Sequence, residues 1–364
     1  MKFTREQLSI IEAPESKILV NASAGTGKTF TLIGAAERVM REQKNSQVAI
    51  FTFTRDAAAE IKERLMILPV FVGTIHGFAL REIEKMEEKN LLISEIMSED
   101  KMKRLLLNSY IKFYPVRRGY RKEVSDLFRY LTERDYRPDF KLISRYNMVL
   151  DDYKKEKERL ELYDFTDAPE YFFKKSKELK YETDFTHLFV DEVQDIDLWE
   201  YKIISDFKKN VFAIGDPRQS IYQFRNSITQ TFDKLEKMGY NLYVLSKNFR
   251  SYEEILKLAE APLEAERGSG GVITDTALLE EEGTVILCRY NFEVRALEPY
   301  FEEVRTIHSY KGLENNKIFL VSFDGDKEED KNLRFVAITR ARDKFGTGTF
   351  QETLEKGRKI KYGF

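Results

Sequence analysis

The sequence contains little cysteine, proline and glycine, and it lacks a long apolar run. Its 364 residues include one cysteine, 8 prolines and 18 glycines. The single cysteine, Cys288, excludes an intramolecular disulfide and fits a reducing compartment. No stretch approaches the ~20 apolar residues of a membrane-spanning helix, and the N-terminus M-K-F-T-R-E-Q lacks an apolar signal segment. We therefore expect a soluble, cytoplasmic protein that does not associate with membranes.

The sequence also lacks an excess of either charge. Its 60 basic and 62 acidic residues leave a net charge of −2, so the whole chain exerts no electrostatic attraction on nucleic acid. Binding to DNA would need a local groove. With 42% hydrophobic residues, the chain is long enough for two or three domains that each bury a core.

Strand-like and helix-like segments alternate over the first 80 residues. Strand patterns at 18–20, 48–53 and 70–73 are each followed by a helical pattern, which predicts an α/β fold with a parallel sheet. Long charged helices then predict a helical insertion over residues 82–162.

The strand pattern returns after the insertion. We expect a second α/β domain to begin near Gly239, where a glycine ends a helical pattern. The strands expected in this part of the chain lie at 187–190, 211–214, 241–245, 284–287, 304–307 and 317–321.

A glycine-rich turn near the N-terminus reads N-A-S-A-G-T-G-K-T over residues 21–29. In a strand–turn–helix of this kind, backbone N–H groups and the helix N-terminus cradle an anion. Gly25 and Gly27 let the backbone approach a phosphate, Lys28 supplies positive charge, and Thr29 offers a hydroxyl to Mg²⁺. The pattern favours a nucleotide site over an ordinary strand-to-helix turn.

Two carboxylates end an apolar run in the segment F-V-D-E-V-Q-D. A carboxylate at the C-terminal end of a neighbouring parallel strand can hold Mg²⁺, and a second can accept a proton from the attacking water. We assign Asp191 to the metal and Glu192 to the general base. The alternative is an acidic strand end that faces solvent, which Lys28 and Thr29 in the same chain disfavour.

The turn A-S-A-G-T-G-K-T and the segment D-E-V-Q-D together resemble those of superfamily 1 DNA helicases of the UvrD/PcrA/Rep type. Ala22 stands where the general phosphate-binding pattern has glycine, and these helicases commonly have alanine there. Further segments match family motifs, in family order, from residue 7 to residue 342. Agreement at so many separated positions is far stronger than a single motif. These segments are F-T-R-E-Q-L-S-I-I, F-T-F-T-R-D-A-A-A-E-I-K-E-R-L, V-G-T-I-H-G-F-A-L, Y-D-F, I-G-D-P-R-Q-S-I-Y-Q-F-R, L-S-K-N-F-R-S, V-R-T-I-H-S-Y-K-G-L-E and F-V-A-I-T-R-A-R.

The resemblance implies two RecA-like domains of the P-loop NTPase class, with a helical insertion in the first. The first motor domain would comprise residues 1–81 and 163–238, the insertion 82–162, and the second motor domain 239–364.

The resemblance also implies roles around ATP and Mg²⁺. Gln7 would read adenine, Phe249 would stack on it, and Glu314 would contact the ribose. Gln219 would sense the γ-phosphate, which Arg250 and Arg340 would reach as arginine fingers. The implied nucleotide set is Gln7, Ala24, Gly25, Thr26, Gly27, Lys28, Thr29, Phe249 and Glu314, and the catalytic set is Lys28, Glu192, Gln219, Arg250 and Arg340.

A third implied set faces single-stranded DNA. Aromatic rings would stack on bases, and hydroxyl, imidazole and ammonium groups would contact phosphates. Taken singly, Phe53 and Phe224 are better explained as core residues; Phe224 stands where the family has tryptophan. The implied DNA set is Phe53, Thr74, His76, Tyr222, Phe224, Arg225, Thr306, His308 and Lys311.

The sequence departs from the family at the second insertion, which is essentially missing. Residues 285–291, V-I-L-C-R-Y-N, are followed almost at once by Val304, so we expect ATP-driven translocation more firmly than unwinding. The leading hypothesis is a monomeric helicase or translocase that moves 3′ to 5′ on single-stranded or tailed duplex DNA. An ATP-switched DNA clamp or loader, and a motor subunit of a nuclease complex, remain open. Either would act with a protein partner such as a polymerase or nuclease, without unwinding DNA independently.

Overall fold

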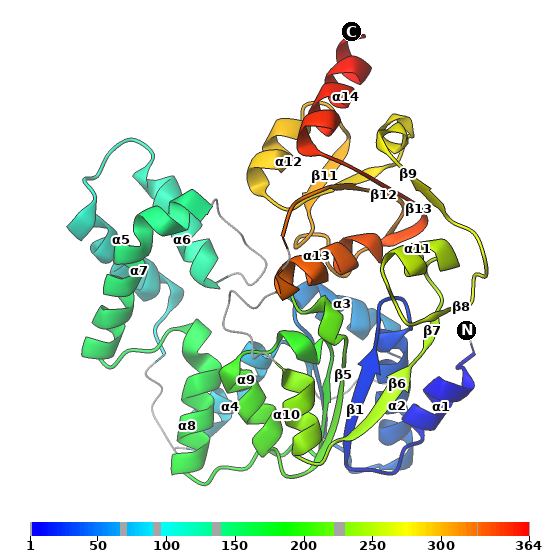
Figure 1. Cartoon of the computed structure of the whole chain (residues 1–364). Helices are drawn as coiled ribbons and strands as arrows, with labels where there is room; N and C mark the ends of the chain where they lie inside the picture. Colours follow the sequence, from blue (N-terminus) through cyan, green and yellow to red (C-terminus); the bar gives the residue numbers. More distant parts are fainter. Residues whose placement is uncertain are drawn as a thin grey trace. The chain divides into compact units, whose positions relative to one another are not determined.

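The computed structural model describes residues 2–65, 71–89, 96–132, 140–221, 230–325 and 327–363 (Figure 1). The chain divides into two compact units. The first comprises Met1–Phe53, Ala59–Val72 and Phe185–Phe364, and the second comprises Thr54–Ala58 and Gly73–Asp184.

A six-stranded sheet in the first unit has the order β3-β2-β4-β5-β1-β6. The pairs β2–β4, β4–β5, β5–β1 and β1–β6 are parallel, and Val20 lies opposite Ile214 and Tyr243. Parallel strands are covered on both faces, which explains the continuous apolar runs of this sheet. The strands are β1 Lys17–Ala22, β2 Val48–Phe51, β3 Phe71–Gly73, β4 His187–Val190, β5 Asn210–Gly215 and β6 Asn241–Leu245.

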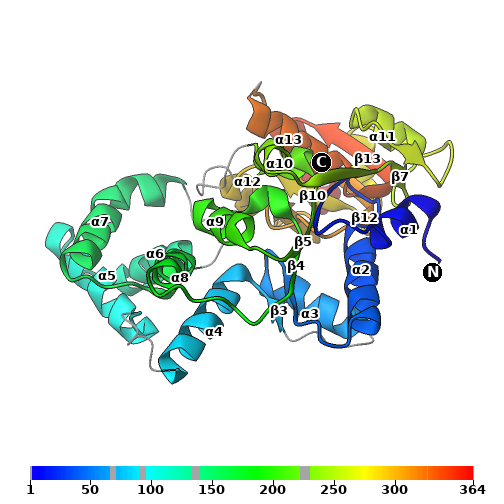
Figure 2. The same ribbon diagram turned by 90° about the horizontal axis from the view of Figure 1, so that it is seen from below.

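Helices lie on both faces of this sheet. The chain runs from β1 to β2 in one direction along the sheet and from β4 through β5 to β6 in the other. Right-handed crossovers therefore bring α2 to one face and α9 and α10 to the other, and α1 packs beside α2 (Figure 2). The helices are α1 Arg5–Ile11, α2 Lys28–Glu42, α3 Arg55–Arg64, α9 Leu198–Asp206 and α10 Thr231–Lys237.

A second sheet, of five parallel strands, has the order β11-β10-β12-β13-β9. Alternate residues of β10 face two different apolar clusters, as the strand period of two requires. Val285 and Leu287 pack with α11 and α13, whereas Ile286 and Cys288 pack with α12 and α14. The strands are β9 Val272–Thr274, β10 Val285–Cys288, β11 Glu303–Thr306, β12 Asn315–Val321 and β13 Ala341–Gly348. The helices are α11 Glu253–Leu258, α12 Asn291–Leu297, α13 Glu328–Ile338 and α14 Phe350–Tyr362. A separate two-stranded sheet pairs β7 Lys247–Asn248 with β8 Glu264–Ala265.

The second unit is helical. Its core between α5, α6 and α7 is rich in tyrosine, and Tyr110, Tyr146 and Tyr153 are almost completely buried there. The Tyr153 hydroxyl donates to Asp164 Oδ2 at 2.7 Å, so this buried polar group is satisfied. The helices are α4 Ile75–Glu88, α5 Glu99–Phe113, α6 Tyr120–Thr132, α7 Phe140–Arg159 and α8 Ala168–Glu178.

The α/β class with two parallel sheets is confirmed, but one expected strand was assigned to the wrong sheet. Residues 241–245 were expected to open the second α/β domain, and they form the edge strand β6 of the first sheet. The reason is the crossover from β5 through α10, which returns the chain alongside β1. The first sheet therefore extends past Gly239.

In the described parts of the chain, no helix combines the length and apolarity needed to cross a bilayer.

Packing in the helical unit gives a stability prediction. Leu106 is fully buried in the cluster between α5, α6 and α7, whereas Ile111 on the same helix is 48% exposed. Leu106→Ala leaves a cavity and is expected to lower the free energy of unfolding by about 2–5 kcal/mol. Ile111→Ala is the matched control and should cost less than about 0.5 kcal/mol. Urea denaturation followed by circular dichroism measures both, and equal losses would contradict this packing.

Candidate active site

The turn after β1 forms a phosphate cradle. Its backbone is left-handed at Gly25, with φ 73°, and at Gly27, with φ 82°. Helix α2 begins at Lys28, so its first N–H groups face the turn. The Thr26 hydroxyl donates to Ser23 O at 2.8 Å and stabilises the turn.

Strand order brings the two predicted carboxylates to this cradle. β4, β5 and β1 are neighbours, so their C-terminal ends meet at one edge of the sheet. Thr29 Oγ1 donates to Asp191 Oδ2 at 3.2 Å, and Lys28 Nζ lies 4.0 Å from Glu192 Oε1. A hydroxyl and a carboxylate are ligands that Mg²⁺ prefers, so Thr29 and Asp191 fit the metal and Lys28 fits the phosphates of its nucleotide.

The two carboxyl groups have opposite pKa shifts. Burial, together with the negative charge of Glu192, raises the pKa of Asp191 to about 7. Burial also disfavours the ionised form of Glu192, but the positive charges of Lys28 and Lys311 outweigh it and lower the pKa of Glu192 to about 2. Glu192 is therefore ionised at neutral pH, as a group that accepts a proton must be.

The backbone of Glu192 is left-handed, with φ 52°, which is unfavourable for a residue with a side chain. Two contacts hold it there. The Glu192 N–H donates to Asp191 Oδ1 at 2.9 Å, and Gln194 Nε2 donates to Glu192 Oε2 at 2.5 Å. The amide oxygen of Gln194 accepts from Asp216 N at 3.0 Å, so Gln194 ties Glu192 to the end of β5.

The segment Asn248–Arg250 lies directly against the phosphate turn. The Phe249 N–H donates to Gly25 O at 2.8 Å, and Asn248 Nδ2 donates to Ala24 O at 2.5 Å. A Cβ on Gly25 would come within 2.8 Å of the Arg250 Cβ. The absence of a side chain at Gly25 therefore permits this contact.

Arg250 contacts both the phosphate turn and residues next to strands of the second sheet. Its guanidinium pairs with Glu314 and donates to Thr339 O at 3.2 Å. Glu314 was expected to contact the ribose, and Arg250 was expected to act as an arginine finger; in this structure the two side chains pair with each other. The Phe249 ring, expected on adenine, is 42% exposed.

A second chain of contacts joins the cradle to Arg340. Ser23 Oγ donates to Asp216 Oδ2 at 3.1 Å, Gln219 Nε2 donates to the same oxygen at 2.7 Å, and Arg340 Nη2 donates to Gln219 Oε1 at 2.8 Å. Arg340 is 2% exposed. Burial and the positive charge of Arg250 lower the pKa of Arg340 to about 9, so the guanidinium stays charged at neutral pH.

Gln7 reaches the cradle from α1. It is part of a capping box with Thr4 at the start of that helix. Its Nε2 donates to Thr26 O at 3.3 Å.

The residues predicted to contact DNA lie in different parts of the structure. Phe53 packs against the second-sheet cluster that contains Leu287 and Phe345. Tyr222, Phe224 and Arg225 lie outside the residues that the structure describes.

Thr74 and His76 belong to the helical unit. The Thr74 hydroxyl caps α4 by accepting from Gly77 N at 3.2 Å, and the His76 ring lies 3.2 Å from Thr166 O.

The remaining predicted DNA residues are mostly buried. Thr306 Oγ1 accepts from Ser309 N at 3.2 Å, and His308 is 3% exposed. The Lys311 ammonium pairs with Asp195 and donates to Gln219 O at 2.7 Å. Contact of Lys311 with a DNA phosphate stays a prediction, and it requires this pair to separate.

Sequence reasoning missed four residues that hold the site together: Asn248, Gln194, Asp195 and Asp216. All four lie inside the segments that carry the family resemblance, beside residues to which a role was given. Only the three-dimensional structure shows that they join those segments to one another.

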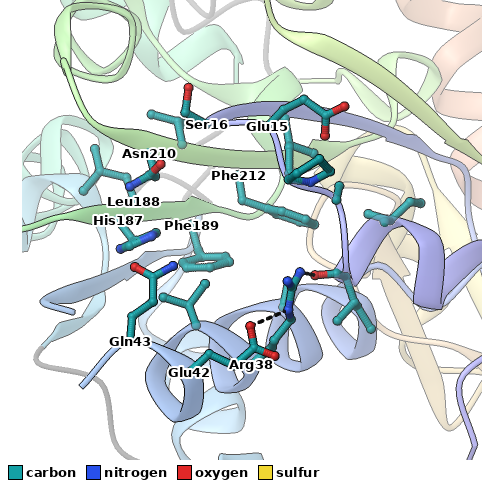
Figure 3. Close-up of a pocket in the computed structure, with 18 residues that line it drawn as sticks. Glu15, Ser16, Arg38, Glu42, Gln43, His187, Leu188, Phe189, Asn210 and Phe212 are labelled. Atoms are coloured by element: carbon teal, nitrogen blue, oxygen red, sulfur yellow. Dashed lines mark hydrogen bonds and ion pairs between the residues drawn. The ribbon is translucent and has the colours of Figure 1, made fainter. Parts of the chain in front are cut away.

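A separate pocket lies at the opposite, N-terminal edge of the first sheet (Figure 3). The C-terminal part of α2 and the starts of β4 and β5 line it, with Gln43, His187, Asn210 and Phe212 among the residues drawn. Burial lowers the pKa of His187. The cradle residues 23–29 do not line this pocket, so it is distinct from the cradle.

Comparisons with known proteins show the family to which this chain belongs. The UvrD/REP helicase N-terminal domain family matches residues 3–239, and the viral superfamily 1 RNA helicase core domain matches residues 142–347. DNA helicase II of Salmonella typhimurium and that of Escherichia coli are each 28% identical to this chain over 313 residues, which are 79% of this chain and 44% of each relative. The ATP-dependent DNA helicase PcrA of Staphylococcus aureus is 28% identical over 287 residues, which are 70% of this chain and 39% of the relative. The chain thus spans less than half the length of these relatives.

The contact at Gly25 gives a prediction with a matched control. Gly25 and Gly283 have nearly equal φ values, 73° and 74°, but a Cβ on Gly25 would lie 2.5 Å from Asn248 Nδ2, whereas Gly283 has nothing within 4 Å. Gly283→Ala should cost about 1 kcal/mol of unfolding free energy because of its backbone conformation. Gly25→Ala should cost about 1–3 kcal/mol more, because it forces Asn248 and Arg250 away. Chemical denaturation measures both losses, and equal values would show that the segment does not lie on the turn.

Proposed function

The chain belongs to the UvrD/REP helicase family, and on that premise we propose that it is an ATP hydrolase stimulated by single-stranded DNA. Hydrolysis drives movement along the strand from 3′ to 5′, with or without separation of duplex DNA ahead of the protein. DNA helicase II and PcrA are the names of relatives that cover most of this chain.

One observation carries the proposal: arginines associated with the second sheet lie beside the phosphate cradle of the first. Arg250 belongs to the segment that contacts Gly25, and Arg340 bonds to Gln219 at 2.8 Å. Phosphoryl transfer needs positive charge that is already in position around the γ-phosphate. A cradle completed by a second domain makes hydrolysis depend on how the domains meet.

Each of these side chains has a separate role in the proposed hydrolysis. Lys28 holds the terminal phosphates, Thr29 and Asp191 hold Mg²⁺, and Glu192 accepts a proton from the attacking water. Mg²⁺, when bound with ATP, neutralises charge on the phosphate oxygens. Arg250 and Arg340 stabilise the charge that develops in the transition state, and Gln219 senses the γ-phosphate.

The base and sugar of ATP are held by residues next to the cradle. Gln7, which touches Thr26, reads the adenine, and the exposed ring of Phe249 stacks on it. Glu314 takes the ribose, so nucleotide binding releases Arg250 from its pair with Glu314.

DNA lies along a track that includes residues of both motor domains. Stacking on aromatic rings is worth about 1–3 kcal/mol per base and is indifferent to sequence. Lys311 exchanges its pair with Asp195 for a DNA phosphate, which couples the track to the loop that carries Gln219. The track residues are Phe53, Thr74, His76, Tyr222, Phe224, Arg225, Thr306, His308 and Lys311.

The motor has two domains and one insertion. The first comprises residues 1–81 and 163–238 together with β6, the insertion comprises 82–162, and the rest of the chain forms the second. A single helix, α12, joins β10 to the neighbouring β11, with no large insertion between them. Translocation is therefore the core activity.

Substitutions in the cradle test the proposed hydrolysis. Lys28→Ala and Glu192→Gln are each expected to lower the DNA-stimulated ATP hydrolysis rate by about 100-fold or more, because they remove phosphate charge and the proton acceptor. Chelation of Mg²⁺ with EDTA should have the same effect. Phosphate release with and without oligonucleotide is the measurement, and Lys44→Ala, an exposed lysine beyond the end of α2, is the control. Hydrolysis that DNA does not stimulate would contradict the proposal.

Strand displacement on duplexes with a 3′ or a 5′ tail tests polarity and unwinding together. Displacement from the 3′-tailed duplex supports the helicase. A protein that removes streptavidin from single-stranded DNA without separating a duplex is a translocase. Nucleotide-dependent DNA binding with neither activity would instead support the clamp, or a motor that needs a nuclease partner.

A further inference from the structure

Arg218 connects the first sheet to two helices of the second. It lies in the turn after β5, immediately before Gln219. Its Nη2 donates to Ala259 O at 2.9 Å and its Nη1 to Glu260 O at 2.6 Å, at the C-terminal end of α11. Its guanidinium also lies over the Phe335 ring of α13, 3.9 Å from the ring centroid.

These two helices lead to the two arginine fingers. α11 begins shortly after Arg250, with Tyr252 as its N-cap, and α13 ends immediately before Thr339 and Arg340. Arg250 donates to Thr339 O, and Arg340 donates to Gln219, the residue next to Arg218. A continuous path of contacts therefore runs from Arg218 through α11, Arg250, Thr339 and Arg340 and returns to Gln219 in the turn after β5.

The chemistry of arginine suits this position. The last carbonyls of a helix have no partner within the helix and carry partial negative charge, so a cation stabilises them. A planar guanidinium can donate to two carbonyls and stack flat on an aromatic ring at the same time, whereas a lysine ammonium is a compact point charge with no plane to stack. Asp216 Oδ1 accepts from the Arg218 N–H at 3.0 Å, so the turn itself is fixed to the end of β5.

We propose that Arg218 is a positioning residue that holds Arg250 and Arg340 in register with Gln219. It touches no phosphate and acts through α11 and α13. Without it, ATP still binds to the cradle, but the two arginines no longer reach the γ-phosphate together. This inference rests on the proposed ATP hydrolysis.

The kinetic test compares Arg218, which packs on α13, with Arg334, which belongs to α13. Arg218→Ala should lower the kcat of DNA-stimulated ATP hydrolysis by about tenfold or more, the equivalent of one lost charge-assisted hydrogen bond, with the KM for ATP changed less than about twofold. Arg218→Lys should recover only part of the loss. Arg334→Ala is the matched control, because Arg334 also donates to two backbone carbonyls, Phe323 O and Gly325 O, but within the second-sheet domain. An unchanged kcat in Arg218→Ala, or an equal loss in Arg334→Ala, would overturn the proposal.

A second measurement does not depend on hydrolysis. Fluorescent labels on cysteines introduced at the exposed positions Lys44 and Gln351 report the distance between the two sheets, and the native Cys288 is buried away from the label. Arg218→Ala should broaden the distribution of energy-transfer efficiency, and Arg334→Ala should not. A wild-type protein that hydrolyses no ATP refutes the proposed function alone, and a distribution that Arg218→Ala leaves unchanged refutes the role of Arg218.

Discussion

The contact between Gly25 and the segment Asn248–Arg250 is the constraint on which the site depends. A side chain on Gly25 would collide with Asn248 and Arg250, so the cradle turn must carry glycine there. The backbone then bonds directly, through Phe249 N–H to Gly25 O. This contact brings an arginine to a phosphate cradle built more than 200 residues earlier in the chain. The contact that brings Arg250 to the cradle therefore also fixes the segment Asn248–Arg250 against the first sheet.

Buried charges connect the two sheets. Lys311 pairs with Asp195, and Arg340 bonds to Gln219, with little exposure of any of these side chains. A buried charge without its partner is costly, so these groups favour one arrangement of the sheets. Any ligand that competes for Lys311 or Arg340 changes the free energy of that arrangement. Under the proposed function, the same groups would couple nucleotide and DNA binding to domain movement.

Local patterns predicted most of the elements, because strands such as β4 and β5 are short apolar runs that end in turn residues. β13 was missed: its sequence A-R-D-K-F-G-T-G lacks the alternation of a strand, and its place in the sheet comes from pairing with β12 and β9. β6 was recognised as a strand but assigned to the wrong sheet, because pairing is not a local property. In the site, the motifs identified the groups suited to phosphate and metal. The bonds of Gln194, Asp216 and Asn248 depend on strand order, which a single sequence does not show.

The left-handed backbone of Glu192 has a consequence for how this protein can change. Glycine would adopt that conformation at lower energy, so the carboxylate is retained at the expense of folding stability. Under the proposed hydrolysis, selection for stability and selection for catalysis therefore oppose each other at this residue. In a descendant that no longer hydrolysed ATP, replacement of Glu192 by glycine would relieve this unfavourable backbone conformation. Under the proposed function, the identity of residue 192 in related chains would separate those that hydrolyse ATP from those that do not.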